Sequence, residues 1–319
     1  LKPEGRVDEL GIGVLRDGLS NRLFPGISTI QTRAKYFFIV PYILWDFLKT
    51  TPAERRKKLP TEYLEKEEYE MMWDLADHYK HEEGYGVIGI SKRREFGEKI
   101  ARRPSEIYWN GLNVMKCLDS KGLSANSFLN RANRENSESL VHATAEEGHG
   151  DDTDAVFENF FHLKVPYVDE WQKDLNLDLH VSEAKFLKDS MKDLENSILN
   201  LVMSNEKATE IFLNTNQFIH FAKMIVGLDI DEDLRKDIIL AHDFAILMEG
   251  AHIAYNQELQ TRFFQIDYFK ENWNNWYENL DNKMLDLQNF EINKLFEYAP
   301  TTREKTRTFV KEWLLLVKA

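Results

Sequence analysis

The sequence DEDLRKDIILAHDFAILMEGAHIAYNQEL, residues 231–259, has the clearest helical periodicity in the chain and decides its fold class. Mostly apolar side chains recur there at alternating steps of four and three residues, which places them on one stripe of a long helix. The stripe consists of Leu234, Ile238, Ala241, Ala245, Met248, His252, Tyr255 and Leu259. Because such a stripe needs apolar partners, the pattern predicts a C-terminal helical bundle.

Glycine and proline are distributed unevenly along the 319 residues. Of 15 glycines, 13 lie at or before Gly150, and Pro166 and Pro300 are the only prolines in the second half. Both residues interrupt regular structure, so the C-terminal half should form long helices and the N-terminal half helices broken by loops. We therefore predict a mainly α protein with a loop-broken helical portion over residues 1–140, an acidic linker or loop over 141–154 and a helical bundle over 155–319.

Several further elements are predicted from capping residues and breakers. Residues 8–33 should form a turn-rich polar loop holding a buried Arg16-Asp17 pair, and an apolar helix should follow directly over about 34–48. Continuous helices are expected from Ser182 to Met203 and from about Glu206 to Gly227, and a last helix after Thr301. Three short helices over 92–102, 104–118 and 124–134 would be compatible with a helix-turn-helix-like subdomain.

Residues 89–103, GISKRREFGEKIARR, carry six basic and two acidic side chains, a net charge of +4 within a chain whose total is −13. Such a segment can contact nucleic-acid phosphates, with Tyr108 and Trp109 nearby as stacking groups. The candidate nucleic-acid-binding residues are Lys92, Arg93, Arg94, Arg102 and Arg103. The alternative, which is the commoner use of a charge run, is a solvated face whose cations pair with acidic neighbours.

Two patterns could attract a metal ion, and neither is a complete site. Residues 142–154 hold five carboxylates and two histidines without the spacing of a calcium or zinc motif, so we interpret them as an acidic loop. Glu249 and His252 have the Glu-x-x-His spacing of carboxylate-bridged bundles, but no second such pair lies in a helical segment. We therefore expect no bound metal, no cofactor and a hydrogen-bonded core position for His252. The dipeptide His242-Asp243 lacks the other residues of a phosphohydrolase motif.

The remaining composition limits the class of protein. The net charge of −13 argues against nucleic-acid binding over the whole surface. The single cysteine, Cys117, cannot form an internal disulfide, and we interpret it as a packed residue in a reducing compartment. The longest apolar run, residues 34–48, is shorter than the roughly 20 residues that cross a bilayer. We accordingly expect a cytoplasmic protein without a membrane partner.

Three strings of this chain resemble an uncharacterised family of bacterial proteins catalogued as a domain of unknown function. They are GIGVLRDGLSNRLFPGISTIQTRAKYFFIVPYI, RRPSEIYWNGLNVMKCL and FAILMEGAHIAYN, at residues 11–43, 102–118 and 244–256. Members of that family look like soluble cytoplasmic proteins that are often encoded among helicases, methyltransferases or nucleases in defence and mobile gene clusters. The resemblance implies an anti-phage role, and it marks Arg16, Asp17, Thr32 and Arg33 as positions of the opening motif without a catalytic role.

The functional hypothesis is an accessory or sensor subunit of a bacterial anti-phage defence system, without catalysis of its own. Its partners would be DNA or RNA, or protein subunits of the same defence system. One alternative is a metal-dependent nuclease or phosphohydrolase that uses the acidic loop or the Glu249/His252 pair. A second alternative is a purely structural assembly protein whose helical faces serve only to bind neighbours.

Overall fold

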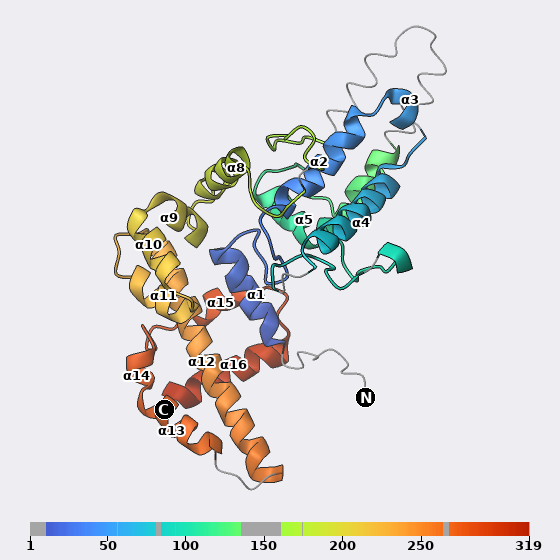
Figure 1. The fold of residues 1–319 in the computed structure, drawn as a ribbon. Helices are drawn as coiled ribbons and strands as arrows, with labels where there is room; N and C mark the ends of the chain where they lie inside the picture. Colours follow the sequence, from blue (N-terminus) through green and yellow to red (C-terminus); the bar gives the residue numbers. More distant parts are fainter. Residues whose placement is uncertain are drawn as a thin grey trace. The chain divides into compact units, whose positions relative to one another are not determined.

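The computed structural model describes residues 11–55, 57–80, 84–92, 94–134, 161–173, 175–263 and 268–318, and all regular structure within them is helical (Figure 1). The mainly α fold is therefore confirmed. The chain forms two compact units, one of residues 1–25 with 192–319 and the other of residues 26–191. This division differs from the expected domains, because the opening segment joins the C-terminal helices. The expected linker at 141–154 lies outside the described residues.

The first unit begins with α1 (Ile12–Leu23), where a polar loop was expected. Leu15, Leu19 and Leu23 follow one another at steps of four and are buried. Gly18 lies within this helix and permits close packing, because a Cβ atom there would lie 2.6 Å from the carbonyl oxygen of Tyr298. The prediction of a loop was wrong because glycine can serve contact between helices as well as turns.

The long helix predicted from residues 231–259 is α12 (Glu232–Phe263). Leu234, Ile238 and Met248 of the expected stripe are buried, whereas His252 and Tyr255 are exposed. The core position predicted for His252 is therefore wrong. The second half of α12 uses another face, where the indole of Trp276 packs so closely on Gly250 that a Cβ atom would lie 2.3 Å from the ring.

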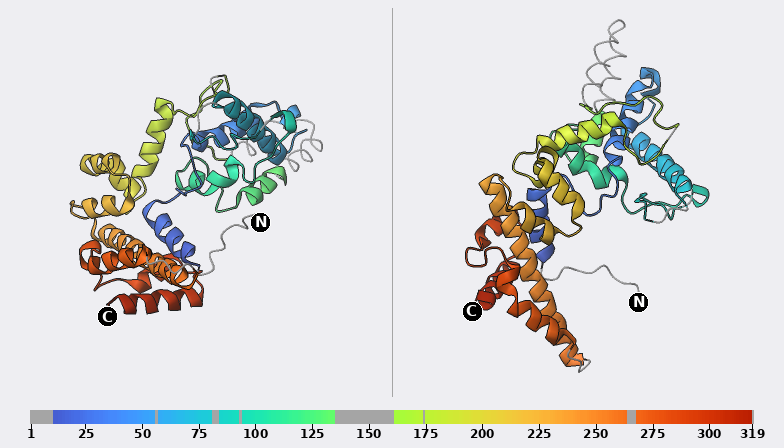
Figure 2. Two further views of the ribbon diagram at one scale, coloured as in Figure 1. Left: turned by 60° about the horizontal axis from the view of Figure 1, so that its bottom comes forward. Right: turned by 60° about the vertical axis from the view of Figure 1, so that its left-hand side comes forward.

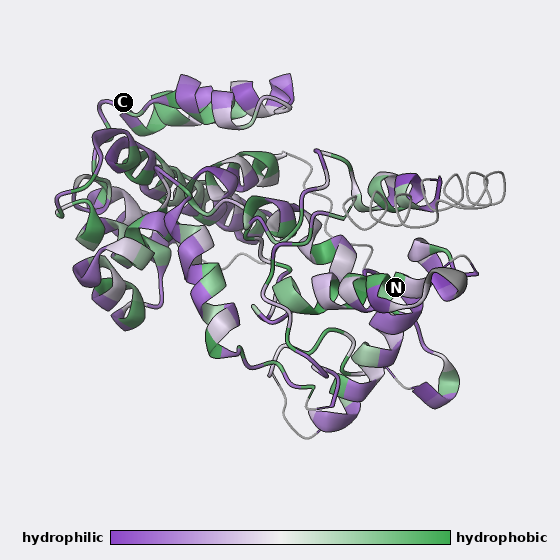
Figure 3. Ribbon diagram, turned by 90° about the horizontal axis from the view of Figure 1, so that it is seen from above, coloured by the Kyte–Doolittle hydropathy of each residue, from purple (hydrophilic) through white to green (hydrophobic). Residues whose placement is uncertain are grey.

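Trp276 lies on α13 (Tyr268–Glu278), and its indole N–H donates to the Ile246 carbonyl of α12 at 3.2 Å. By length and composition, the stretch Glu232–Gln260 could cross a membrane, but buried core helices pass the same test and 56% of its most apolar window is buried. Figure 3 shows polar and apolar segments alternating along the helices, as amphipathic packing requires.

The other helices of this region are shorter than predicted. The expected helix over 182–203 is divided into α8 (Val181–Lys192) and α9 (Ile198–Ser204), because Ser197 accepts a hydrogen bond from the Asn200 N–H and starts a new helix. The expected helix over 206–227 is likewise divided. Its two parts are α10 (Glu206–Asn214) and α11 (Phe218–Ile225). Three helices follow α13 in the sequence: α14 (Leu280–Lys283), α15 (Ile292–Tyr298) and α16 (Glu304–Lys318).

A buried charge cluster joins three helices of the first unit. The carboxylate of Asp237 on α12 is fully buried, and its oxygens accept from Arg22 Nε of α1 at 2.7 Å and from the Tyr298 hydroxyl of α15 at 2.6 Å. Lys294 Nζ of α15 lies 2.7 Å from the same carboxylate. Because a buried carboxylate is costly without such partners, this cluster fixes α1 against the C-terminal helices.

The second unit is built on α2 (Tyr36–Lys49), α3 (Pro52–Arg55), α4 (Pro60–His78) and α5 (Pro104–Val114), which Figure 2 shows from two further sides. The apolar helix predicted near 34–48 is thereby confirmed as α2. It is tied to α8 by the buried Lys35 ammonium, 2.8 Å from both carboxylate oxygens of Glu183. The Tyr42 hydroxyl donates to the same carboxylate at 2.7 Å. Cys117 is buried, as expected.

The predicted helix over 92–102 is wrong. The segment contains a single 3₁₀ turn, η1 (Arg94–Phe96), and Gly97 follows it with a φ of +59°. The neighbouring residues favour a helix, but Gly97 adopts the left-handed backbone conformation and ends the turn. Residues 104–114 and 125–134 are helical, so two of the three expected short helices form within the described residues.

The Asp237 cluster makes a direct prediction about stability. Replacement Asp237→Ala would leave the Arg22 and Lys294 cations without their buried counter-charge, and it should lower the free energy of unfolding by about 3 kcal/mol. Denaturant unfolding of the purified chain measures this. Asp233→Ala, an exposed change on the same helix, serves as the control and should cost less than about 1 kcal/mol. Equal effects of the two substitutions would contradict the role of the cluster.

Candidate functional site

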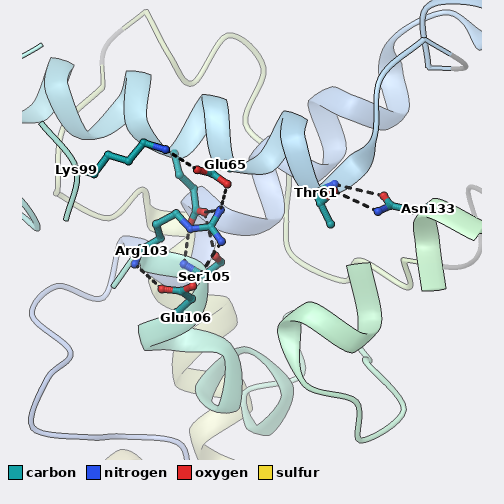
Figure 4. A network of polar contacts seen from close by, with 8 residues as sticks. Thr61, Glu65, Lys99, Arg103, Ser105, Glu106 and Asn133 are labelled. Atoms are coloured by element: carbon teal, nitrogen blue, oxygen red, sulfur yellow. Dashed lines mark hydrogen bonds and ion pairs between the residues drawn. The ribbon is translucent and has the colours of Figure 1, made fainter. Parts of the chain in front are cut away.

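The basic segment lies beside the acidic side of α4. Arg94 pairs with Glu70 at 3.1 Å and Asp74 at 2.8 Å, and its guanidinium lies 5.6 Å from the ring centroid of Trp73. Arg103 pairs with carboxylates of both α4 and α5 at 3.4–3.6 Å (Figure 4). Lys99 also pairs with Glu65 at 3.2 Å, so nearby carboxylates balance three of the six basic side chains of this segment.

Two of the candidate cations remain available. Arg102 is exposed and Lys92 is partly exposed, and neither has an ion pair or side-chain hydrogen bond among the described residues. Arg93 lies outside the described residues. The expected stacking groups are unavailable: Tyr108 and Trp109 are buried, and the Trp109 indole N–H donates to the Leu123 carbonyl.

A buried carboxyl group connects α4 to the start of α5. Glu68 accepts hydrogen bonds from the Ser105 N–H at 2.6 Å and the Ser105 hydroxyl at 2.9 Å. The same carboxylate lies 3.6 Å from Arg103. Within α5, the Glu106 carboxylate accepts from the Arg103 N–H at 3.0 Å. Glu68 thus satisfies an N–H group in the first turn of α5, a task that a capping residue of the helix itself usually performs.

Burial raises the pKa of Glu68 from 4.5 to about 7, although the hydrogen bonds from Ser105 and the charge of Arg103 act in the opposite direction. A raised pKa means that the folded chain binds this proton more tightly than the unfolded chain. The stability contributed by protonation is therefore complete below pH 4.5 and is lost as the pH rises through about 7.

The four positions of the family motif have structural contacts. The Tyr108 hydroxyl accepts from the Thr32 N–H at 2.7 Å and from the Arg33 N–H at 3.0 Å, which holds this loop on α5. The Arg33 guanidinium lies 4.0 Å from the centroid of the Tyr85 ring. Arg16 and Asp17 form an ion pair at 2.8 Å on α1 and are exposed, so their predicted burial is wrong.

The weak metal candidates lie on the wall of a cavity of about 560 Å³ in the first unit. Glu249 there is 3.8 Å from Lys283, which competes with a metal cation for the carboxylate. No group of three or more His, Cys, Asp or Glu side chains suited to a metal occurs in the described parts of the chain, which exclude the acidic stretch 142–154. The spacing of Glu249 and His252 within one helix is visible in the sequence, whereas the approach of Lys283 depends on the fold.

The His242-Asp243 dipeptide is buried and has an anchoring role. The Asp243 carboxylate accepts from the Leu285 and Asp286 N–H groups, both at 2.8 Å, and lies 2.7 Å from His242 Nδ1. These contacts hold the segment after α14 against α12, which explains why an ionisable pair lies in the middle of a core helix.

The titration of Glu68 makes a pH-dependent prediction. Replacement Glu68→Gln keeps an oxygen acceptor for Ser105 and removes the charge, so the variant should gain stability relative to the wild type as the pH rises. The difference in unfolding free energy, variant minus wild type, should increase by about 3 kcal/mol between pH 4.5 and pH 8.5. Denaturant unfolding at both pH values tests this, with Glu62→Gln at an exposed position of α4 as control. A gain that is the same for both variants would refute it.

Comparison with known proteins gives one assignment. No curated protein and no solved structure matches the chain significantly. The model of a family of unknown function, DUF6361, matches residues 1–318. This match covers all three strings that suggested the family and both structural units. The chain therefore belongs to the family of unknown function DUF6361.

Proposed function

We propose that this protein is an accessory or sensor subunit of a bacterial anti-phage defence system that works by binding partner proteins and has no chemistry of its own. The single observation that carries the binding role is the exposed apolar surface of α10 and α11. Leu213 is 77% exposed, Met224 is 51% exposed and Phe212 is 46% exposed. The defence context is supported by the resemblance of the three strings to family members encoded in defence clusters.

Both sides of this helix pair carry apolar side chains. Ala208, Phe221 and Ile225 are buried in the first unit, and their burial already accounts for one apolar face of each helix. Leu213 and Met224 are exposed and do not belong to that buried face. Single exposed apolar side chains are common, but large ones on two helices that pack together favour a surface covered by a partner.

A second candidate activity is a local contact with nucleic acid. Its support is the pair of cations, Lys92 and Arg102, that the carboxylates of α4 leave unpaired within the described residues. Two phosphate contacts would add salt-sensitive affinity without sequence readout. They would suit a subunit that is brought to nucleic acid by a larger complex.

The protein-binding proposal predicts loss of a complex on charge insertion. The chain is co-expressed with the product of each neighbouring gene, and a stable complex is expected on size-exclusion chromatography. The double variant Leu213→Asp/Met224→Asp should bind at least about tenfold more weakly. Leu315→Asp, at an exposed leucine of α16, is the matched control and should bind normally. Complexes of unchanged affinity with the double variant would exclude this surface.

The nucleic-acid proposal predicts a change in salt dependence. In titrations of single-stranded DNA at several salt concentrations, Lys92→Glu/Arg102→Glu should reduce the slope of log affinity against log salt by about 1.5. The control Lys236→Glu/Lys305→Glu changes the charge equally at exposed lysines of the first unit. An equal change of slope in both variants would show a nonspecific charge effect and would exclude a contact at Lys92 and Arg102.

A further inference from the structure

The cavity of about 560 Å³ beside α12 has the size of a small-molecule site. Its apolar lining comes from Ala245, Met248 and Ile253 of α12. The polar lining comes from three helices, with Glu249, His252 and Asn256 on α12, Asn272 and Asn275 on α13, and Lys283 at the end of α14. The contact of Trp276 with Gly250 and its hydrogen bond to the Ile246 carbonyl hold α13 against α12, and both helices line this cavity.

Hydrogen-bonding capacity in the cavity is unevenly divided between its walls. On α12, the Asn256 side-chain N–H group donates to the His252 carbonyl, and the Asn256 amide oxygen and the Glu249 carboxylate are acceptors on residues that line the cavity. On the opposite wall, the Asn275 amide oxygen accepts from Asn279, which leaves the Asn275 N–H groups as donors. Lys283 adds an ammonium donor to that wall. One wall therefore offers acceptors and the other offers donors.

The charges of the cavity restrict the ligand further. Glu249 and Lys283 contribute one charge of each sign, and their 3.8 Å separation is longer than a hydrogen bond. A metal ion or a polyphosphate would leave one of the two charges opposed to it. A zwitterion satisfies both, because its ammonium group binds the acceptor wall and its carboxylate binds the donor wall.

We propose that this cavity binds a zwitterionic α-amino acid with a large apolar side chain. Glu249 and the Asn256 oxygen receive the ammonium group, and Lys283 and the Asn275 N–H groups receive the carboxylate. The side chain then contacts Met248 and Ile253. This site would give the protein a small-molecule ligand, and it depends on neither the protein partner nor the nucleic-acid contact proposed above.

Isothermal titration of the full chain with leucine, methionine, phenylalanine and tryptophan tests this. At least one should bind with 1:1 stoichiometry, and its N-acetyl amide, which lacks both charges, should bind at least about tenfold more weakly. Glu249→Gln and Lys283→Met should each weaken binding of the zwitterion about tenfold. Glu258→Gln is the control, because Glu258 lies on α12, pairs with Arg262 and is outside the cavity lining.

Three results would overturn the proposal. They are no binding of any of the four amino acids, equal binding of the capped and free forms, and unchanged affinity in both Glu249→Gln and Lys283→Met. Because the protein-binding variants at Leu213 and Met224 lie on other helices, loss of amino-acid binding and loss of the protein complex are separable outcomes.

Discussion

The pairing of the buried Asp237 carboxylate is the constraint on which the first unit depends. Its two oxygens receive Arg22, Lys294 and Tyr298, and these partners come from helices at opposite ends of the sequence. A carboxylate removed from water requires such donors, so separation of α1 from the unit would leave the Asp237 oxygen that accepts from Arg22 without its partner. The same principle acts in the second unit, where Glu183 is fully buried and receives both Lys35 and the Tyr42 hydroxyl.

This constraint also explains the electrostatics of the basic segment. The net charge of +4 counts only the side chains of residues 89–103. In the fold, carboxylates of the neighbouring helix α4 balance Arg94 and Arg103. The buried carboxyl group of Glu68 belongs to the same contact and holds the start of α5. Within the described part of this segment, Lys92 and Arg102 are the cations without a carboxylate partner, so a nucleic-acid contact by the segment would depend on these two side chains.

Elements with a strong local signal could be predicted from the sequence. The 3.6-residue repeat of residues 231–259 predicted α12, and the apolar run near 34–48 predicted α2. Packing between distant residues could not be predicted. Gly18 serves a close contact with Tyr298, and Arg22 meets Asp237 across a separation of 215 residues. A single sequence carries no signal for either contact, so its local pattern predicts a loop at the residues that form α1.

The candidate sites show the same limit. Glu249 and His252 were found because their spacing lies within one helix, whereas Lys283 and Asn275 come from other helices that only the fold brings to the cavity. His252 was expected in the core because it continues the apolar stripe of α12. The close contact of Trp276 with Gly250 moves the packed face of the helix and leaves His252 exposed.

The central claim is that α1 forms one cooperative unit with the C-terminal helices while residues 26–191 form another. Hydrogen exchange of the full chain in increasing denaturant, followed by mass spectrometry of its peptides, tests this most directly. Peptides from α1 should lose protection at the same denaturant concentration as those from α12 and α15. Loss of protection of α1 together with α2, α4 and α5, or well before α12 and α15, would contradict the account.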